Sequence, residues 1–216
     1  MTATDARPLW RQPVLIAIFL LCLLPELVLA GADWGLWGNP RWRLWAIRSA
    51  GFWAGLLHGW QPNYAAQPWA MFVTYGFLHA GTVHFAVNML TLFSLGGPLA
   101  ERLGPMRFVV LYTLSDIGGA AGYALLSSHL QPMVGASGAL FGLAGAVVAL
   151  GWRTIRASGG SLWPVGRAVA GLAALNLVLW WAMNGQLAWE THLGGFIAGW
   201  IAALWLDRPA RAADLP

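Results

Sequence analysis

The sequence predicts an all-α, polytopic membrane protein with six transmembrane helices. Hydrophobic residues make up 58% of the 216 residues, whereas charged residues make up only 9%. A soluble domain carries roughly 25% charged residues, so this chain has too few charges to cover a surface that faces water. Crossing a bilayer takes about 20 mostly apolar residues of helix, and several stretches here are that long. Backbone groups in lipid must be paired within the segment, so each stretch is expected to be helical.

Six stretches meet this length requirement and are predicted to be the transmembrane helices. They make up a single membrane domain at residues 13–206, flanked by tails at residues 1–12 and 207–216. The six predicted helices lie at residues 13–31, 82–99, 107–126, 135–151, 167–184 and 187–206.

The first of these stretches also has features of a secretory signal peptide. It follows Arg7 and Arg11 and ends in the small residues Ala30-Gly31-Ala32. Its apolar part is long for a signal peptide and contains Glu26, which favours a retained transmembrane helix. Cleavage there would leave the arrangement of the other five helices unchanged.

Arginine supplies all of the positive charge, because the chain has no lysine and a net charge of +4. The arginines occur in ones and twos between apolar runs, which is typical of membrane loops, and we therefore expect no nucleic-acid binding. With the N-terminus inside, nine arginines fall on the inner side and three on the outer side. Both tails are thus predicted to be cytoplasmic, in a bacterial inner membrane. The inner set is Arg7, Arg11, Arg102, Arg107, Arg153, Arg156, Arg167, Arg208 and Arg211, and the outer set is Arg41, Arg43 and Arg48.

Cysteine usage limits the chemistry that the chain can perform. Its single cysteine, Cys22, lies in an apolar run and excludes both an internal disulfide and a CxxC motif. No cofactor and no bound metal are predicted.

One long connection, at residues 32–80, is unusually rich in tryptophan. Tryptophan prefers the headgroup level of a membrane, so this segment is predicted to lie in one leaflet rather than free in water. Residues 41–60 mix bulky apolar and basic side chains, as an interfacial helix does. The tryptophans of the connection are Trp34, Trp37, Trp42, Trp45, Trp53, Trp60 and Trp69.

Three groups of polar residues fall inside predicted helices, where polar side chains are costly and usually functional. His84 and Asn88 begin the second helix, Ser137 begins the fourth, and His192 lies near the start of the sixth. Even-numbered helices cross the membrane in the same direction. All three groups are therefore expected at a similar depth, in the outer leaflet.

The spacing of these residues has physical reasons. His84 and Asn88 are four residues apart and so share one face of a helix. Glycines recur at positions 138, 142 and 145 of the fourth helix, and at 195 and 199 of the sixth. Small residues let helix backbones approach closely in lipid. Ser137 and His192 can form a hydrogen bond only if their two helices nearly touch, which the glycines permit.

In this order, the motifs closely resemble those of the rhomboid family of intramembrane serine proteases. The family pattern is His-xxx-Asn, then Gly-x-Ser-Gly, then His-xx-Gly-xxx-Gly. It is present here at His84–Asn88, Gly135–Gly138 and His192–Gly199, and the resemblance extends back to Trp42-Arg43 in the first loop. The resemblance implies a six-helix rhomboid-like bundle that cleaves transmembrane protein substrates within the lipid bilayer.

The resemblance also implies a role for each motif residue. Ser137 would be the nucleophile and His192 the general base of a Ser–His dyad. The backbone N–H of Ser137 and the side chains of His84 and Asn88 would form the oxyanion hole. Gly135 would leave room for the substrate backbone.

Two further positions are interpreted through the resemblance. His79 resembles a second family histidine that is structural rather than catalytic. The residue four after the serine, often tyrosine in rhomboids, is Phe141 here; it can pack on the His192 ring but lacks the hydroxyl.

Two other functions remain open from the sequence. A non-catalytic rhomboid-like protein would bind membrane clients, although such relatives typically lose the serine or the histidine. A small transporter would use Asp116 and Glu26 as coupling sites, but the chain is short and has no detectable repeat. We interpret Asp116 as a structural acid and Glu190 as a solvated charge on the outer face.

Overall fold

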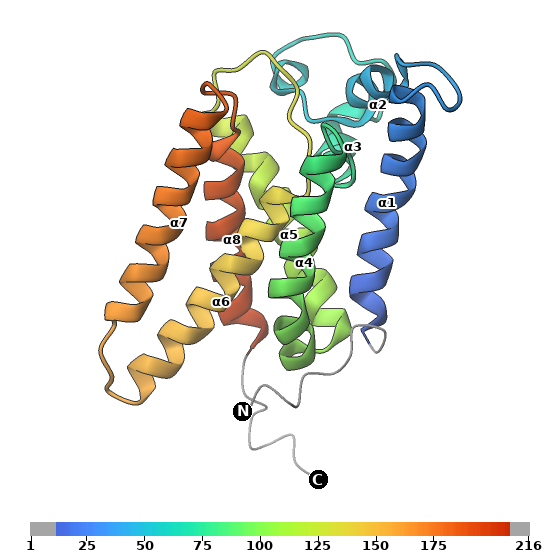
Figure 1. Cartoon of the computed structure of the whole chain (residues 1–216). Helices are drawn as coiled ribbons and strands as arrows, with labels where there is room; N and C mark the ends of the chain where they lie inside the picture. Colours follow the sequence, from blue (N-terminus) through green and yellow to red (C-terminus); the bar gives the residue numbers. More distant parts are fainter. Residues whose placement is uncertain (1–11, 208–216) are drawn as a thin grey trace.

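The computed structural model describes residues 12–207, and within that range the chain folds into helices joined by turns and loops (Figure 1). A single isolated bridge pairs Phe52 with Met133. Six long helices run alternately up and down, and α1 begins at the same end of the bundle at which α8 finishes. They are α1 (Pro13–Asp33), α4 (Thr82–Leu103), α5 (Pro105–Leu126), α6 (Ser137–Ala157), α7 (Trp163–Ala182) and α8 (Trp189–Leu206).

These helices confirm the predicted fold class. Five of them, α1, α4, α5, α6 and α7, are long and apolar enough to cross a membrane. The sixth predicted span, α8, falls short of that hydropathy because its 18 residues include Glu190 and His192 in the first turn. The two tails, which the sequence predicts to be cytoplasmic, lie almost entirely outside the described residues. Four of the arginines on which the predicted orientation depends lie wholly outside them. Those arginines are Arg7, Arg11, Arg208 and Arg211.

The observed boundaries differ most from the predicted ones at α4, α6 and α7, and α4 ends at Leu103 rather than at residue 99. Helix α6 continues to Ala157 rather than stopping near residue 151, and α7 begins at Trp163 rather than at residue 167. A hydropathy criterion marks only the part of a helix that lies in hydrocarbon. Backbone hydrogen bonding continues past it, here through the polar segment that contains Arg153 and Arg156.

Close backbone contact between α8 and its neighbours α5 and α6 forms the centre of the bundle. A Cβ atom on Gly195 would overlap the carbonyl oxygen of Gly138 in α6, and one on Gly194 would overlap that of Gly118 in α5. Only glycine fits at such contacts. Helix α7, by contrast, has no buried residue and lies at the edge of the bundle (Figure 1).

The long connection between α1 and α4 folds over one end of the bundle as short helices (Figure 1). The interfacial helix expected across residues 41–60 is shorter than predicted, because α2 ends at Ala50 where Gly51 adopts an extended conformation. Most of the tryptophans in this connection are exposed, as expected for a segment that contacts headgroups. The elements are α2 (Trp42–Ala50), η2 (Ala54–Leu57), α3 (Gln67–Thr74) and η3 (Tyr75–Phe77).

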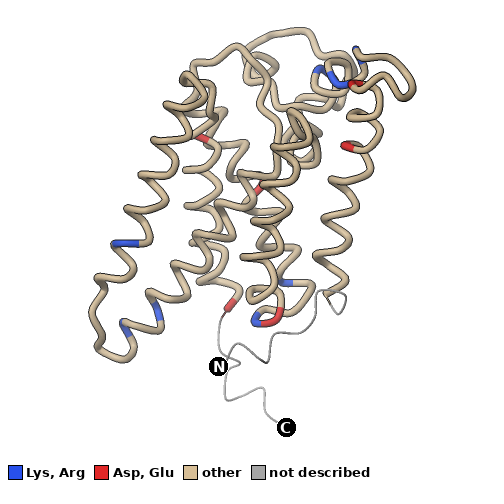
Figure 2. Tube along the Cα trace, viewed as in Figure 1, with Lys and Arg blue, Asp and Glu red and all other residues tan. Residues whose placement is uncertain are grey.

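Charged residues concentrate at the two ends of the bundle, and few lie between them (Figure 2). Asp116, in the middle of α5, is one of these few and has only 3% of its surface exposed. Gly76 packs directly on its carboxyl group, and the Tyr75 hydroxyl donates to its backbone carbonyl at 2.7 Å. Asp116 is thus enclosed by its neighbours, and its role as a structural acid stays a prediction.

Candidate active site

Ser137 and His192 meet where α6 and α8 begin. The Ser137 Oγ lies 3.0 Å from the His192 Nε2, although the two residues are 55 positions apart. Ser137 is the first residue of α6, and it follows Gly135, whose φ of +125° favours glycine. His192 is buried in the first turn of α8. The glycine contacts between the two helices bring these side chains within hydrogen-bonding distance.

The His192 ring is held on two sides. Phe141, one turn after Ser137 on α6, stacks on it with ring centroids 4.0 Å apart and planes 6° from parallel, as predicted. Asn176 of α7 holds the other ring nitrogen, because its Oδ1 lies 2.7 Å from the His192 Nδ1. None of the sequence motifs contains Asn176. The rule that polar residues inside membrane helices are functional would have found it, since it interrupts an apolar stretch of α7.

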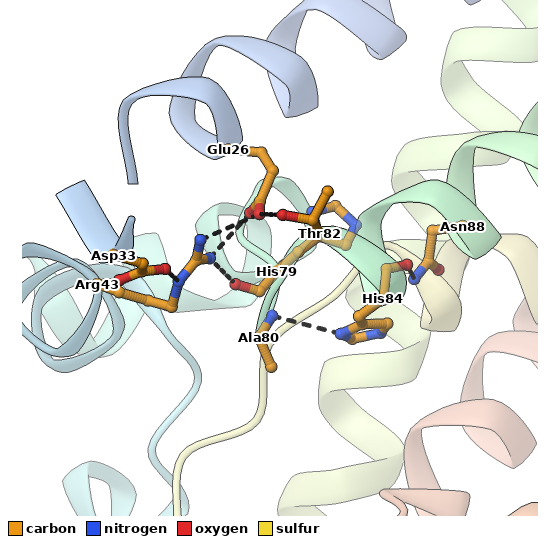
Figure 3. A network of polar contacts seen from close by, with 8 residues as sticks. All are labelled: Glu26, Asp33, Arg43, His79, Ala80, Thr82, His84 and Asn88. Carbon is orange, nitrogen blue, oxygen red and sulfur yellow. Dashed lines mark hydrogen bonds and ion pairs between the residues drawn. The ribbon is translucent and has the colours of Figure 1, made fainter. Parts of the chain in front are cut away.

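His84 lies beside Gly135, two residues before Ser137. A Cβ atom on Gly135 would come within 2.6 Å of the His84 Cε1, so the imidazole packs directly on this glycine. The His84 Nδ1 accepts a hydrogen bond from the Ala80 backbone N–H at 3.4 Å. Figure 3 shows that Asn88 points its amide back along its own helix, where Nδ2 donates to the His84 carbonyl at 2.7 Å. The structure thus places His84 next to the site, while the hydrogen bond recorded for the Asn88 amide stays within α4.

A network of ionic hydrogen bonds around Arg43 ties the long connection to the start of α4 (Figure 3). Arg43 of α2 makes two hydrogen bonds to the Glu26 carboxylate, at 2.8 and 3.0 Å, and one to Asp33 at 2.5 Å. It also donates to the His79 carbonyl oxygen at 2.7 Å. Thr82, the first residue of α4, donates to Glu26 at 3.3 Å. Glu26 would be a coupling site in the transporter interpretation. In the structure its carboxylate forms an ion pair with Arg43.

His79 itself is buried, and burial favours its neutral form. Burial, together with the nearby His84 and Arg43, lowers the pKa of His79 to about 3. Neither ring nitrogen has a hydrogen-bond partner in residues 12–207. Its ring packs edge-on against His84 and Phe85. The ring is therefore held by packing, and the structural role of His79 stays a prediction.

Glu190 corrects one interpretation from the sequence. Only 3% of its surface is exposed, so it is not a solvated charge on the outer face. Its backbone carbonyl lies against Gly122 of α5, in the tight contact between α5 and α8. Because the helices approach so closely there, the first turn of α8 is enclosed, and Glu190 with it.

A cavity of about 540 Å³ opens beside His192 between α7 and the pair α6 and α8. Among its lining residues, Asn176 and His192 are the ones whose side chains carry polar atoms other than indole nitrogens. Within residues 12–207, no three or more His, Cys, Asp or Glu side chains are grouped so that they could hold a metal ion. The other lining residues are Phe141, Val169, Leu172, Ala173, Leu177, Trp180, Trp189, Leu193 and Phe196.

The helical bundle and its serine–histidine pair define a class: multi-pass membrane proteins with a polar site enclosed among the helices. A sequence model of the Rhomboid domain matches residues 65–209. That is more than half of the chain, and the chain therefore belongs to the rhomboid family.

Individual relatives support the same assignment. The chain is 33% identical over 151 residues to the rhomboid protease GluP of Bacillus subtilis (strain 168), and the aligned stretch covers 69% of this chain and 28% of that protein. It is 34% identical over 150 residues to RHOMBOID-like protein 1 of Arabidopsis thaliana, covering 66% of this chain and 36% of the relative. The Inactive RHOMBOID-like protein 8 of the same plant is 34% identical over 76 residues, covering 35% of this chain and 21% of the relative. The chain thus spans about a third or less of the length of these curated relatives.

Proposed function

We propose that this protein is an intramembrane serine endopeptidase in which Ser137 is the nucleophile and His192 the general base. The observation that supports this most directly is the 3.0 Å contact between Ser137 Oγ and His192 Nε2. A serine hydroxyl attacks poorly unless a base takes its proton. His192, when neutral, takes that proton and later returns it to the leaving amine.

The oxyanion hole in this proposal consists of the Ser137 backbone N–H with the side chains of His84 and Asn88. Fixed donors aimed at the developing oxyanion lower the barrier to acyl transfer. The His84 ring lies against Gly135, two residues before the nucleophile, which supports its part in this set. Asn88 keeps one amide proton for an oxyanion while the other donates to the His84 carbonyl. Gly135 leaves space for the substrate backbone.

The substrates in this proposal are transmembrane segments that unwind near the outer face of the bilayer. Small or helix-breaking residues favour such unwinding because they lower helix propensity. The arginine distribution supports an orientation with both tails, residues 1–12 and 207–216, in the cytoplasm of a bacterial inner membrane. His84, Ser137 and His192 then all lie toward the outer face.

Labelling with a fluorophosphonate tests this proposal directly. Wild-type protein in detergent should react at Ser137, and Ser137→Ala should not react. Ser94→Ala is a matched control, because Ser94 is an exposed serine on α4 whose hydroxyl, within residues 12–207, donates to the Leu90 carbonyl of its own helix. It should label and cleave a transmembrane reference substrate like wild type.

Two results would refute the enzyme proposal. One is cleavage at an unchanged rate by purified Ser137→Ala. The other is a folded wild-type protein that neither labels nor cleaves, which would favour a non-catalytic rhomboid-like protein that binds membrane clients.

A further inference from the structure

Asn176 reaches the candidate active site from α7, a helix that has no buried residue. In residues 12–207 its bond to His192 is the one side-chain hydrogen bond recorded between α7 and another helix. The distance from Asn176 Oδ1 to His192 Nδ1 is 2.7 Å. The opposite ring nitrogen of His192, Nε2, faces Ser137 at 3.0 Å. The three side chains therefore form a continuous Ser–His–Asn chain drawn from three different helices.

The chemistry of the imidazole gives this chain a direction. A neutral histidine has one protonated and one unprotonated ring nitrogen, and the hydrogen bond at one nitrogen sets the state of the other. Asn176 presents a carbonyl oxygen, which only accepts. It therefore holds the proton on Nδ1 and leaves the lone pair on Nε2, where the Ser137 hydroxyl can donate to it.

We propose that Asn176 is a positioning residue that fixes the His192 tautomer and ring orientation for proton abstraction from Ser137. The inference rests on the proposed function and adds a third member to the dyad. Asn176 does not touch the substrate and acts only through His192. Phe141 fixes the plane of the ring by stacking, whereas Asn176 fixes its rotation within that plane.

The surroundings leave Asn176 without a replacement. It lines the cavity of about 540 Å³, and the remaining cavity walls offer no other acceptor side chain. The indole nitrogens of Trp180 and Trp189 only donate hydrogen bonds, so neither can take over the Nδ1 proton. In apolar surroundings this hydrogen bond is stronger than it would be in water. A neutral amide also avoids the cost of burying an unpaired carboxylate among membrane helices.

Two substitutions at this position separate positioning from packing. Asn176→Leu keeps a side chain of similar size but removes the acceptor, whereas Asn176→Asp keeps the acceptor oxygen. Leu172→Ala is the control, because Leu172 lines the same cavity on α7 and has no polar atom in its side chain. For each variant, kcat, KM and the melting temperature are measured, and the tautomer of His192 is read from its imidazole ¹⁵N chemical shifts.

We expect Asn176→Leu to lose kcat with little change in KM and to populate both His192 tautomers. Loss of the correct tautomer costs about 10⁴-fold in kcat in a Ser–His–Asp site, and a neutral orienting group is worth less, so we expect a fall between about 10-fold and 10⁴-fold. Asn176→Asp should recover at least part of the activity lost in Asn176→Leu and keep the proton on Nδ1. Leu172→Ala should lower the melting temperature while turnover per folded molecule and the tautomer stay unchanged.

Turnover per folded Asn176→Leu molecule equal to wild type, or an unaltered tautomer in that variant, would overturn the proposal. If wild type fails to react with the fluorophosphonate, the proposed function fails instead. The ¹⁵N measurement on wild type and Asn176→Leu still tests whether Asn176 sets the tautomer, so the two failures are distinguishable.

Discussion

Gly199 of α8 lies directly on the backbone of Gly142 in α6, where a Cβ atom would overlap the Gly142 carbonyl oxygen and its carbonyl carbon. One turn earlier, Gly195 makes the same contact with Gly138. These paired glycines set the distance between the two helices that carry Ser137 and His192. The hydrogen bond between serine and histidine depends on that distance.

Gly199→Leu should therefore force α6 and α8 apart and lower the melting temperature. Overpacking a well-packed interior costs typically about 1–3 kcal/mol, and here the obstacle is backbone that has little room to shift. Gly151→Leu is the matched control, because a Cβ at that glycine of α6 would have no other described residue within 4 Å apart from its chain neighbours and the backbone of its own helix. Thermal unfolding and substrate cleavage are measured for both variants. A Gly199→Leu protein with the stability and activity of wild type would show that the helices do not meet there.

Asn88→Ala should cleave substrate much more slowly with little change in KM. Removing one oxyanion donor from a soluble serine protease costs about 10²–10³ in kcat, or about 2.7–4 kcal/mol. The variant should still react with a fluorophosphonate, only more slowly, because neither Ser137 nor His192 is altered.

Thr91→Val separates this effect from the loss of a local hydrogen bond. Thr91 lies on the same helix and, like Asn88, bonds the carbonyl four residues earlier, at 2.9 Å. It should change turnover little. If Asn88→Ala lowers the melting temperature while turnover per folded molecule stays normal, Asn88 only supports its own helix and is not part of the oxyanion hole.

Glu26→Ala should destabilise the protein by leaving the Arg43 guanidinium short of a partner. The two side chains are only 4% and 12% exposed. Breaking a buried ion pair costs about 3–5 kcal/mol, and because Asp33 still contacts Arg43 we expect about 3 kcal/mol. Arg102→Ala is the comparison, since Arg102 is 44% exposed where it pairs with Asp207. Exposed pairs contribute about 0–1 kcal/mol, so equal losses in the two variants would contradict the prediction.

His79 should make the protein less stable as the pH falls. Its pKa is lowered to about 3 in the folded protein, against about 6.5 in an unfolded chain. Between these values the unfolded state binds a proton that the folded state does not, so the free energy of unfolding falls as pH falls from about 6.5 to 3. His79 accounts for up to about one of the protons by which the unfolded state exceeds the folded state, and His79→Phe removes this difference. The free energy of unfolding, measured from about pH 3 to 6.5, should change less steeply with pH in the variant than in wild type. Equal slopes in the two proteins would contradict the lowered pKa of His79.

The sequence alone was sufficient to predict the membrane class and most of the candidate site. The low share of charged residues showed that water does not surround the whole protein, and hydropathy located the helices. Both depend on the free energy of transferring each residue into lipid, which is a local property of the sequence. His84 and Asn88 could be placed on one helix face because their spacing of four matches the helical period. The prediction that Phe141 packs on His192 required only the family motifs.

Tertiary structure decided everything that depends on how the helices are rotated and tilted against one another. Two contacts, between Asn176 and His192 and between Glu26 and Arg43, join segments whose separation in the sequence matches no helical period. The burial of Glu190 depends in the same way on how α8 packs against its neighbours. A polar residue in an apolar stretch shows that a partner must exist, since an unpaired polar group in lipid is costly. Which partner it finds is set by side-chain packing at each crossing of two helices, and that information is spread over both helices rather than held in either motif.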